Sequence, residues 1–331
     1  MNCLSSCLRA TPLDTGQKAC KFGEKSAMSH SPDPASNACP SSAGPDGSGP
    51  RITRRRLLKA SALALAAGTG IYTWRIEPHW LEIVDHRLPL ANLPRDLVGA
   101  RLVQLSDLHI GPQVDDGYLR RCFQRVQEMA PEFVVYTGDL TNRDSQAIEH
   151  ARRMFPHLPR GTRGTFGVLG NHDFGARWAE PLLARQIAAV AANVGVQILR
   201  NEVAEVDGLH IVGLDDLWGG RFNPAVGLRA LPSGAASVVL SHNPDTADLP
   251  GWDGYSGWIL AGHTHGGQCK PPFLPPPLLP VTNRRYTSGE FELSGNRRMY
   301  INRGVGHLHR VRFNVRPEVT VFHLQRVGPV G

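Results

Sequence analysis

Cysteine is scarce beyond residue 40 of the sequence. Of the six cysteines, only Cys122 and Cys269 lie beyond residue 40. Two cysteines cannot form the disulfide framework that stabilises small secreted domains, although one pairing between them stays open. The other four are Cys3, Cys7, Cys20 and Cys39. If translation starts at Met28, three of these four are never made.

The body of the chain also lacks an excess of positive charge. The formal net charge is +7, but residues 1–59 hold nine basic and four acidic residues, whereas the remainder holds 27 and 25. A nucleic-acid-binding protein usually carries its basic surface on the folded domain, so we expect no nucleic-acid partner. The 41% hydrophobic and 20% charged residues are typical of a globular protein. At 331 residues the chain can form one large domain or two small ones.

The main apolar run, residues 60–74, is shorter than the roughly 20 residues that a helix needs to span a bilayer. It follows the cationic stretch TRRRLLK at residues 53–59, which is the layout of an export signal. This stretch resembles the twin-arginine signal, which sends folded proteins to the twin-arginine export machinery. We therefore predict a signal or membrane anchor at residues 51–76, either cleaved or retained. The alternative is a basic surface patch before an Ala-rich core helix.

Residues 1–50 are rich in Ser, Pro, Gly and Ala and lack apolar periodicity, which predicts a disordered N-terminal extension. Beyond residue 77, short apolar runs alternate with amphipathic stretches, which predicts an α/β fold with two packed sheets and flanking helices. Helices are predicted over residues 117–130, 145–158 and 178–193. Strands are predicted over residues 101–105, 133–136, 165–169, 203–206, 209–214, 237–240, 258–260, 299–302 and 319–324.

Five of these strands end in a polar cluster. The clusters read SDLH at 106–109, GD at 138–139, GNHD at 170–173, SHN at 241–243 and GHTH at 262–265. One strand-end Asp is usually a helix cap, and one His is usually a surface group, but five clusters in the same position are hard to explain by capping. Because ligands collect outside the carboxyl ends of strands in α/β sheets, we expect these side chains to meet.

Imidazole and carboxylate groups without thiolates suit borderline divalent metals. Two histidines separated by one residue, as in HTH, can reach one metal or two metals about 3.5–4 Å apart. In a two-metal site one carboxylate bridges both ions. Such a pair lowers the pKa of bound water and stabilises both the attacking and the leaving oxygen of a phosphoryl group.

The motifs DxH, GD, GNHD, SHNP and GHTH, in this order, resemble the calcineurin-like metallophosphoesterase superfamily over about residues 77–326. The resemblance implies a four-layer fold, a two-sheet β-sandwich flanked by helices, in a catalytic domain at 77–328. It also implies two divalent ions, which are Mn, Zn or Fe with Mn favoured, and a catalytic His172 that donates a proton to the leaving oxygen or binds phosphate. One ion is bound by Asp107, His109 and His265, the other by Asn171, His242 and His263, and both by Asp139.

The sequence departs from the protein phosphatases of this superfamily, because GDLTNRDS stands where they have GDxVDRG. This difference leaves open whether Arg143 contacts substrate and whether Asp144 or Asp173 orients His172. The signal, the GHTHGGQ motif and the C-terminal strands instead resemble the bacterial membrane-associated branch. We expect a phosphodiesterase or phosphomonoesterase, using hydroxide activated by two metals, on the periplasmic side of the cytoplasmic membrane. The expected partners are a phosphoester substrate, lipid-linked or not, and the membrane surface.

Two other functions remain open: a pyrophosphatase of nucleotide-linked lipid precursors (UDP-diacylglucosamine type) and a non-catalytic metal-binding module. The proline-rich stretch at 271–280 is predicted to be either a rigid loop or an apolar lip that contacts lipid beside the site. His307 and His309 form a second HxH that matches no family motif and is predicted to be structural. Trp218 and Arg221 either shape a substrate pocket or lie in a surface loop.

Overall fold

The computed structural model describes residues 53–252 and 254–328. The predicted N-terminal extension, residues 1–50, lies outside the described residues, together with its four cysteines and Met28. The chain divides into two units, Met1–Thr53 and Arg54–Gly331, and all elements below belong to the second.

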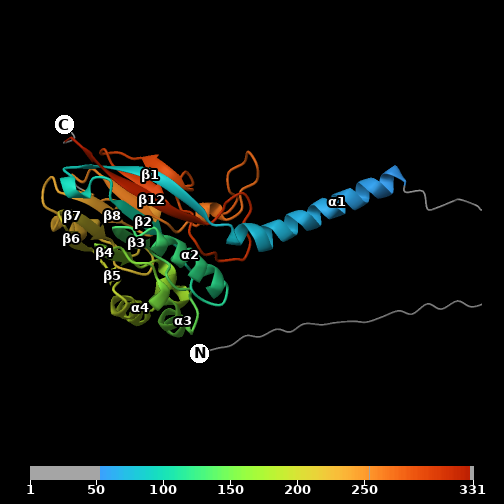
Figure 1. The fold of residues 1–331 in the computed structure, drawn as a ribbon, viewed down its shortest axis with the longest axis horizontal. Coiled ribbons are helices and arrows are strands. Elements are labelled where there is room, and N and C mark those ends of the chain that lie inside the picture. The colour runs from blue at the N-terminus through green and yellow to red at the C-terminus, as the bar shows by residue number, and fades with distance from the viewer. Residues whose placement is uncertain (1–52, 253, 329–331) are drawn as a thin grey trace, which may run out of the picture. The chain divides into compact units, whose positions relative to one another are not determined.

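Six strands form the first sheet (sheet 1) (Figure 1). In spatial order they are β1 (Glu82–Ala91), β12 (Glu318–Val327), β2 (Arg101–Leu105), β3 (Phe133–Thr137), β4 (Gly164–Val168) and β5 (Gln197–Ile198). Strands β2 to β5 pair in parallel, β12 is antiparallel to β2, and β1 is parallel to β12. The carboxyl ends of β2, β3 and β4 therefore lie at one edge of the sheet.

Six further strands form the second sheet (sheet 2). In spatial order they are β10 (Gly289–Glu292), β11 (Arg298–Ile301), β9 (Trp258–Ala261), β8 (Ala236–Leu240), β7 (Leu209–Gly213) and β6 (Glu202–Val206). The four central strands pair in parallel, and the edge strands β10 and β6 are antiparallel to their neighbours.

The two sheets pack face to face because their central strands are apolar on both faces. All five residues of β3 are buried. Phe133 and Val135 point into a core shared with sheet 2, which includes Leu240 of β8. Val134 and Tyr136 point the other way, into the core beneath the helices. Because side chains alternate along a strand with a period of two, β3 contributes side chains to both cores.

Helices cover the outer faces of the sandwich. On sheet 1 they are α2 (Asp116–Glu128), α3 (Ala147–Met154) and α4 (Pro181–Asn193), and α5 (Pro224–Arg229) lies at sheet 2. Asp115 caps α2 by accepting a hydrogen bond from Tyr118 N at 2.7 Å. The predicted sandwich flanked by helices is thus confirmed.

The predicted export segment forms α1 (Arg54–Ile71), in which no residue is buried. Among the described residues, no helix has the length and hydropathy required to span a bilayer. Short helical turns connect the elements: η1 (Tyr72–Ile76), η2 (Glu77–His79), η3 (Arg95–Leu97), η4 (Phe155–His157), η5 (Asn171–Phe174), η6 (Ala176–Trp178), η7 (Pro244–Asp248) and η8 (His265–Gly267).

Some predictions were wrong in detail. The helix predicted from residue 178 begins at Pro181, because Arg177 and Trp178 have positive φ angles and proline favours the first helical turn. The helix predicted over 145–158 ends at Met154, before Pro156. Strands β1, β5 and β10 and helix α5 were not predicted. Cys122 and Cys269 are both free thiols, so the pairing that the sequence left open does not form.

Candidate metal centre

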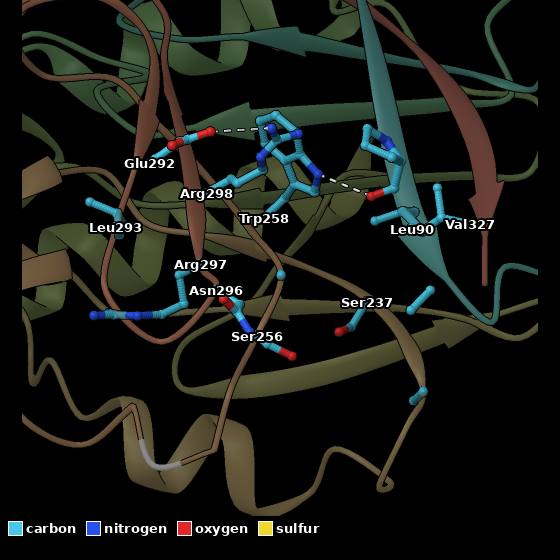
Figure 2. A pocket seen from close by; sticks show the side chains of 14 residues that line it. Leu90, Ser237, Ser256, Trp258, Glu292, Leu293, Asn296, Arg297, Arg298 and Val327 are labelled. Atoms are coloured by element: carbon cyan, nitrogen blue, oxygen red, sulfur yellow. Dashed lines mark hydrogen bonds and ion pairs between the residues drawn. The ribbon is translucent and has the colours of Figure 1, made fainter. Parts of the chain in front are cut away.

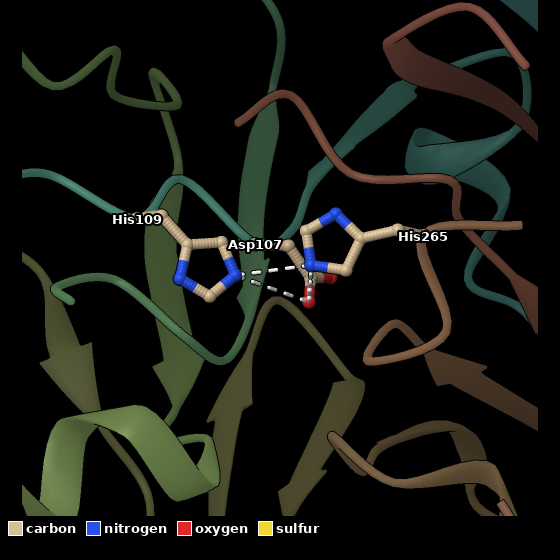
Figure 3. A group of neighbouring side chains, drawn as sticks. All are labelled: Asp107, His109 and His265. Atoms are coloured by element: carbon tan, nitrogen blue, oxygen red, sulfur yellow. Dashed lines mark hydrogen bonds and ion pairs between the residues drawn. The ribbon is translucent and has the colours of Figure 1, made fainter. Parts of the chain in front are cut away.

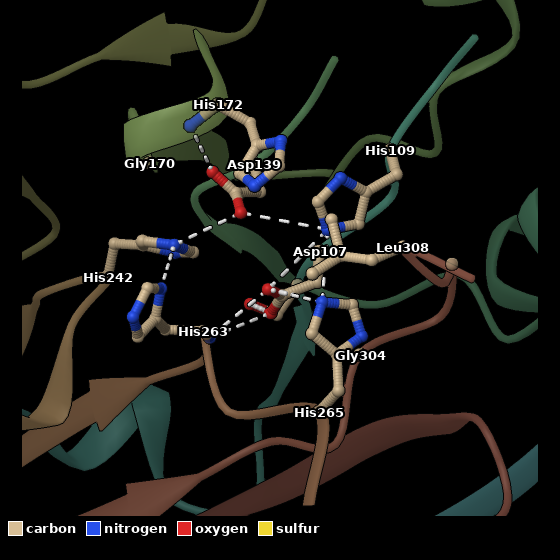
Figure 4. Close-up of polar contacts among 12 residues, drawn as sticks. Asp107, His109, Asp139, Gly170, His172, His242, His263, His265, Gly304 and Leu308 are labelled. Atoms are coloured by element: carbon tan, nitrogen blue, oxygen red, sulfur yellow. Dashed lines mark hydrogen bonds and ion pairs between the residues drawn. The ribbon is translucent and has the colours of Figure 1, made fainter. Parts of the chain in front are cut away.

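The five polar clusters meet where the two sheets end. Gln104 of β2 links the sheets there, since its Nε2 donates to Thr137 Oγ1 of β3 and to the carbonyl of Ala261 of β9, each at 2.9 Å. All eight predicted site residues lie at this edge and are at most 7% exposed. Figure 4 labels each of them except Asn171. They are Asp107, His109, Asp139, Asn171, His172, His242, His263 and His265.

The backbone at the strand ends adopts a conformation that side chains other than glycine rarely take. Asp107, His109, Asp139, His263 and His265 have φ angles between 47° and 71°. Such left-handed residues cost about 1–3 kcal/mol each and collect at functional sites. Five of the eight predicted residues share this feature, which indicates that the fold holds them for function at the expense of stability.

The first group of side chains comprises Asp107, His109 and His265 (Figure 3). The Nε2 atoms of the two histidines lie 3.0 Å apart. Asp107 Oδ1 lies 3.2 Å from His265 Nε2 and 4.0 Å from His109 Nε2. Three potential metal ligands from the ends of β2 and β9 therefore converge on one point.

The second group surrounds His242. Its Nε2 lies 3.3 Å from Asp139 Oδ2, 3.2 Å from Asn171 Oδ1 and 3.1 Å from His263 Nδ1. Asp139 belongs to both groups, because its Oδ2 is also 3.6 Å from His109 Nε2. The carboxylate predicted to bridge two metals thus lies between the two groups of side chains.

Hydrogen bonds at the outer nitrogens set the orientation of two imidazoles. His242 Nδ1 donates to the carbonyl of Thr137 at 2.8 Å, and His263 Nε2 donates to the carbonyl of Pro280 at 2.9 Å. With these tautomers the lone pairs of His242 Nε2 and His263 Nδ1 face each other. Two lone pairs at this distance repel, so a cation belongs between them. Without metal this cation is the proton of His242, whose pKa Asp139 raises to about 10 despite burial, and the residues fit a divalent metal in its place.

The electrostatics of the cluster also suit a cation. Burial lowers the pKa of His263 to about 3 and that of His109 well below its usual range. Burial opposes ionisation of Asp139 as well, but the adjacent histidines, His242 foremost, together outweigh it and lower the pKa of this carboxyl. The carboxylate and the neutral rings of His263 and His109 are in the protonation state that binds divalent metals, and His242 releases its proton when a metal binds.

Glycines allow the strand ends to approach this closely. A Cβ on Gly138 would lie 2.5 Å from His242 Nδ1, and one on Gly170 would lie 2.2 Å from Asp139 Oδ1. Gly304 has a φ of 74°, and a Cβ there would lie 2.8 Å from the Cβ of Asp107. The glycines of the GD and GNHD motifs are therefore required by contact distance.

Residues 100–267, which contain all five clusters, match the family model for calcineurin-like phosphoesterases. The chain belongs to this family. It is therefore a metal-dependent phosphoester hydrolase, and the family implies divalent metal ions at the cluster.

Several named phosphoesterases are similar over most of their length. An uncharacterized metallophosphoesterase of Bacillus subtilis (strain 168), YkuE, is 32% identical, and the match covers 83% of this chain and 98% of that protein. Phosphodiesterase YaeI of Escherichia coli (strain K12) is 32% identical over 82% and 99%. UDP-2,3-diacylglucosamine pyrophosphatase LpxG of Chlamydia trachomatis serovar D is 26% identical over 78% and 93%.

The phosphoesterase orients His172 through a residue that the sequence did not single out. His172 Nδ1 lies 3.3 Å from Asn142 Oδ1, and Asn142 Nδ2 donates to Gln113 Oε1 at 2.5 Å. Asp173 instead accepts hydrogen bonds from the backbone of Leu140, Thr141 and Gly170. Asp144 pairs with His150 at 3.6 Å. Neither aspartate orients His172, and only the position of Asn142, three residues after Asp139, pointed to its role.

A cavity of about 510 Å³ opens beside the cluster of the phosphoesterase. One wall is aromatic: Trp178 and Trp218 stack with ring centroids 4.6 Å apart, and Trp218 packs against the ring of His263. Arg143 and His309 also line the cavity, whereas His307 is buried and bonded to the carbonyl of Gln113, as expected of a structural residue. The other lining residues are Gln113, Asp139, Asn142, Asp144, Asn171, His172, Pro280 and Leu308.

A second cavity of about 420 Å³ lies at the other end of sheet 2 (Figure 2). Its prominent side chains already have partners: Trp258 Nε1 donates to the carbonyl of Pro89 at 3.1 Å, and Arg298 lies 3.6 Å from Glu292. It contains one acidic residue and no histidine. This cavity has no cluster of imidazoles and carboxylates that could hold a metal, so the cavity at the cluster is the candidate active site.

Proposed function

We propose that the protein hydrolyses phosphoesters at a binuclear metal centre. The ligands are those inferred above from the sequence, with Asp139 shared between the two ions. The observation that carries this proposal is the convergence of buried imidazole and carboxylate atoms from five strand ends, with His242 Nε2 and His263 Nδ1 only 3.1 Å apart. Two bound divalent ions would activate a water molecule and offset the charge of the phosphoryl oxygens.

His172 serves as the proton donor to the leaving oxygen. Its backbone N–H donates to Asp139 Oδ1 at 2.9 Å, so the ring lies at the edge of the cluster and also lines the cavity. Asn142 Oδ1 accepts from Nδ1–H, so the proton that Nε2 can transfer is the second proton of the imidazolium form. Burial lowers the pKa of His172, which makes the imidazolium form a stronger acid and also less populated at neutral pH, so proton donation should weaken as the pH rises.

The substrate is a phosphodiester or a phosphomonoester. The similarity to the protein named phosphodiesterase YaeI supports the diester, and the cavity has room for groups on both sides of a phosphate. The side wall formed by Trp178 and Trp218 favours an apolar or planar leaving group, because aromatic surfaces bind such groups with little polar cost.

A pyrophosphatase acting on a nucleotide-linked lipid precursor is the second candidate, favoured by the similarity to LpxG. Such precursors are usually made on the cytoplasmic face of the membrane. A protein exported to the periplasmic side would not meet them. The location of the active site therefore discriminates between the two candidates.

The envelope is the proposed location. The cationic stretch TRRRLLK begins directly before α1, and Arg54 and Arg55 are the twin-arginine pair in this proposal. Ligands that come from five separate strands converge only in the folded chain. Export of an already folded protein lets the cluster load its metals in the cytoplasm.

A substrate panel tests the proposal. Purified protein, loaded in turn with Mn, Zn and Fe, is assayed on aryl phosphomonoesters, aryl phosphodiesters and nucleotide-sugar pyrophosphates. We expect metal-dependent turnover of an ester that chelation abolishes. Turnover of the pyrophosphates alone would favour the second candidate, and no turnover with any metal would contradict the proposed function.

A further inference from the structure

Positive charge in the body is concentrated in three short segments: 72–80, 268–288 and 303–316. Together these segments contain eight basic residues and one acidic residue, Glu77, which is fully buried. Residues 60–331 contain 27 basic and 25 acidic residues, so the rest of that body holds 19 and 24. Residues 60–331, which are nearly neutral as a whole, therefore have one basic part and a remainder of net negative charge.

The three segments are neighbours in the fold. Arg312 N donates to the carbonyl of Thr73 at 3.0 Å, and Val315 N donates to Glu77 Oε1 at 2.6 Å. The backbones of Lys270 and Phe313 are also bonded at 2.9 Å. The basic residues are thus gathered on contacting segments that lie far apart in the sequence.

Large apolar side chains are exposed on the same segments. Trp74 and Trp80 are each 50% exposed, and the guanidinium groups of Arg310 and Arg316 lie over their rings at 5.8 and 4.3 Å. Phe273 is fully exposed. Tryptophan with arginine is the combination that binds the interface of a bilayer, where the ring enters the headgroup layer and the cation meets phosphate.

The proline-rich loop holds its apolar tip in a fixed shape. Six of the ten residues at 271–280 are proline, and Arg284 Nη2 donates to the carbonyls of Pro276 and Pro277 at 3.1 Å. Leu274 and Leu278 are exposed beside Phe273. A loop with this composition cannot collapse to cover these side chains, which are therefore available to a partner.

We propose that an anionic lipid bilayer binds this surface, which we call the docking face. Its apolar residues are Trp74, Trp80, Phe273, Leu274 and Leu278, and its basic residues are Arg75, Lys270, Arg285, Arg310 and Arg316. The bilayer is the partner because one surface combines insertion-competent apolar side chains with an excess of positive charge, in which Arg316 lies 3.8 Å from Glu82.

The docking face adjoins the candidate active site. The loop ends at Pro280, whose carbonyl accepts the hydrogen bond from His263 Nε2 and which lines the cavity. Pro280 follows the exposed Phe273 by seven positions in the chain. Docking therefore brings the cavity to the headgroup layer. The inferred substrate class, which rests on the proposed function, is a phosphoester carried by a membrane lipid.

Flotation of the full metal-loaded chain with vesicles tests the surface. Vesicles of phosphatidylcholine with phosphatidylglycerol are compared with vesicles of phosphatidylcholine alone. The triple variant Phe273→Ser, Leu274→Ser, Leu278→Ser should bind the anionic vesicles about tenfold more weakly than the native chain. The matched control replaces three exposed apolar residues elsewhere, Val98, Leu182 and Val226, by serine and should bind like the native chain. Equal binding of the loop variant and the native chain would overturn the proposal.

A reporter tryptophan distinguishes membrane contact by the loop from membrane contact by α1. The fluorescence added by Phe273→Trp should be quenched by brominated phospholipid in the anionic vesicles, and that added by Leu182→Trp should not. An unquenched tryptophan at position 273 would overturn the docking face even if the chain floats.

The loop variant should keep its turnover of a soluble aryl phosphoester, and loss of that turnover with unchanged vesicle binding would contradict the proposal. Flotation without any turnover in the native chain would refute the proposed function and leave the docking face intact.

Discussion

Asp139 is the residue that joins the two halves of the site. Its Oδ2 lies 3.6 Å from His109 Nε2 and 3.3 Å from His242 Nε2, and its Oδ1 accepts the backbone N–H of His172. Its carboxylate is grouped with His109 on one side and with His242 and His263 on the other. An amide in its place would keep the shape and lose the charge that neutralises two cations.

The variant Asp139→Asn should therefore lose most of its bound metal and its hydrolysis of phosphoesters. Elemental analysis of the purified protein, together with turnover of an aryl phosphoester, measures both effects. If Asp139→Asn retained two metals per chain and native turnover, the bridging role would be wrong.

His172 differs from its neighbours because it is proposed to act on the leaving oxygen. His172→Ala should keep the metal content and lose roughly 10²–10⁴-fold in rate on esters with poor leaving groups. Aryl esters need little protonation and should lose less. Asn142→Ala should show the same selectivity with a smaller loss, since it only releases the ring. Equal losses on both classes of ester would instead indicate that His172 binds phosphate.

At the scale of the elements, the strand ends are built for close contact. Gly138 ends β3 with a φ of 92°, and any Cβ there meets the imidazole of His242 on the opposite sheet. The site therefore requires glycine at position 138 as well as the polar side chains of the cluster.

Gly138→Ala should lower the metal content and destabilise the fold by about 1–3 kcal/mol, from backbone strain and the clash. Gly99→Ala is the matched control, because Gly99 has a φ of 85° and nothing within 4 Å of the added Cβ. The control should show the strain alone and keep its metals. Denaturant unfolding and elemental analysis of both variants decide the matter, and equal metal content in the two would contradict this account of the strand ends.

The elements that could be predicted are those whose apolar pattern is strong. Strands β2 and β3 lie in the middle of a sheet and were predicted to within one residue. Strand β1 lies at an edge, carries Pro89 and alternates between buried and exposed positions, so its pattern is weak. The half-exposed β10 was missed for the same reason.

The site was predictable as a set of residues but not as a set of contacts. The motifs lie at strand ends, and the topology of parallel strands brings them together. The carbonyls of Thr137 and Pro280 that orient two histidines could not be found in the sequence, because every residue has a carbonyl and only the fold selects these two. Asn142 was missed because the family pattern directed attention to the aspartates near it.

At the scale of the whole molecule, the proposed export and the docking face both concern the cell compartment in which the protein acts. The twin-arginine proposal predicts that replacing Arg54 and Arg55 together by Lys keeps active, metal-loaded protein in the cytoplasm, because the export machinery no longer recognises the signal. Fractionation of tagged protein measures this. If the double variant still left the cytoplasm, or the native protein never did, the pyrophosphatase of lipid precursors would become the preferred function.

The central claim is that five strand ends assemble one site for two metal ions. Anomalous diffraction from crystals grown with Mn tests it most directly, because it locates each ion independently of activity. The account predicts two peaks about 3.5–4 Å apart, with Asp139 between them, one near Asp107, His109 and His265 and the other near Asn171, His242 and His263. A single peak, or peaks away from these side chains, would contradict it.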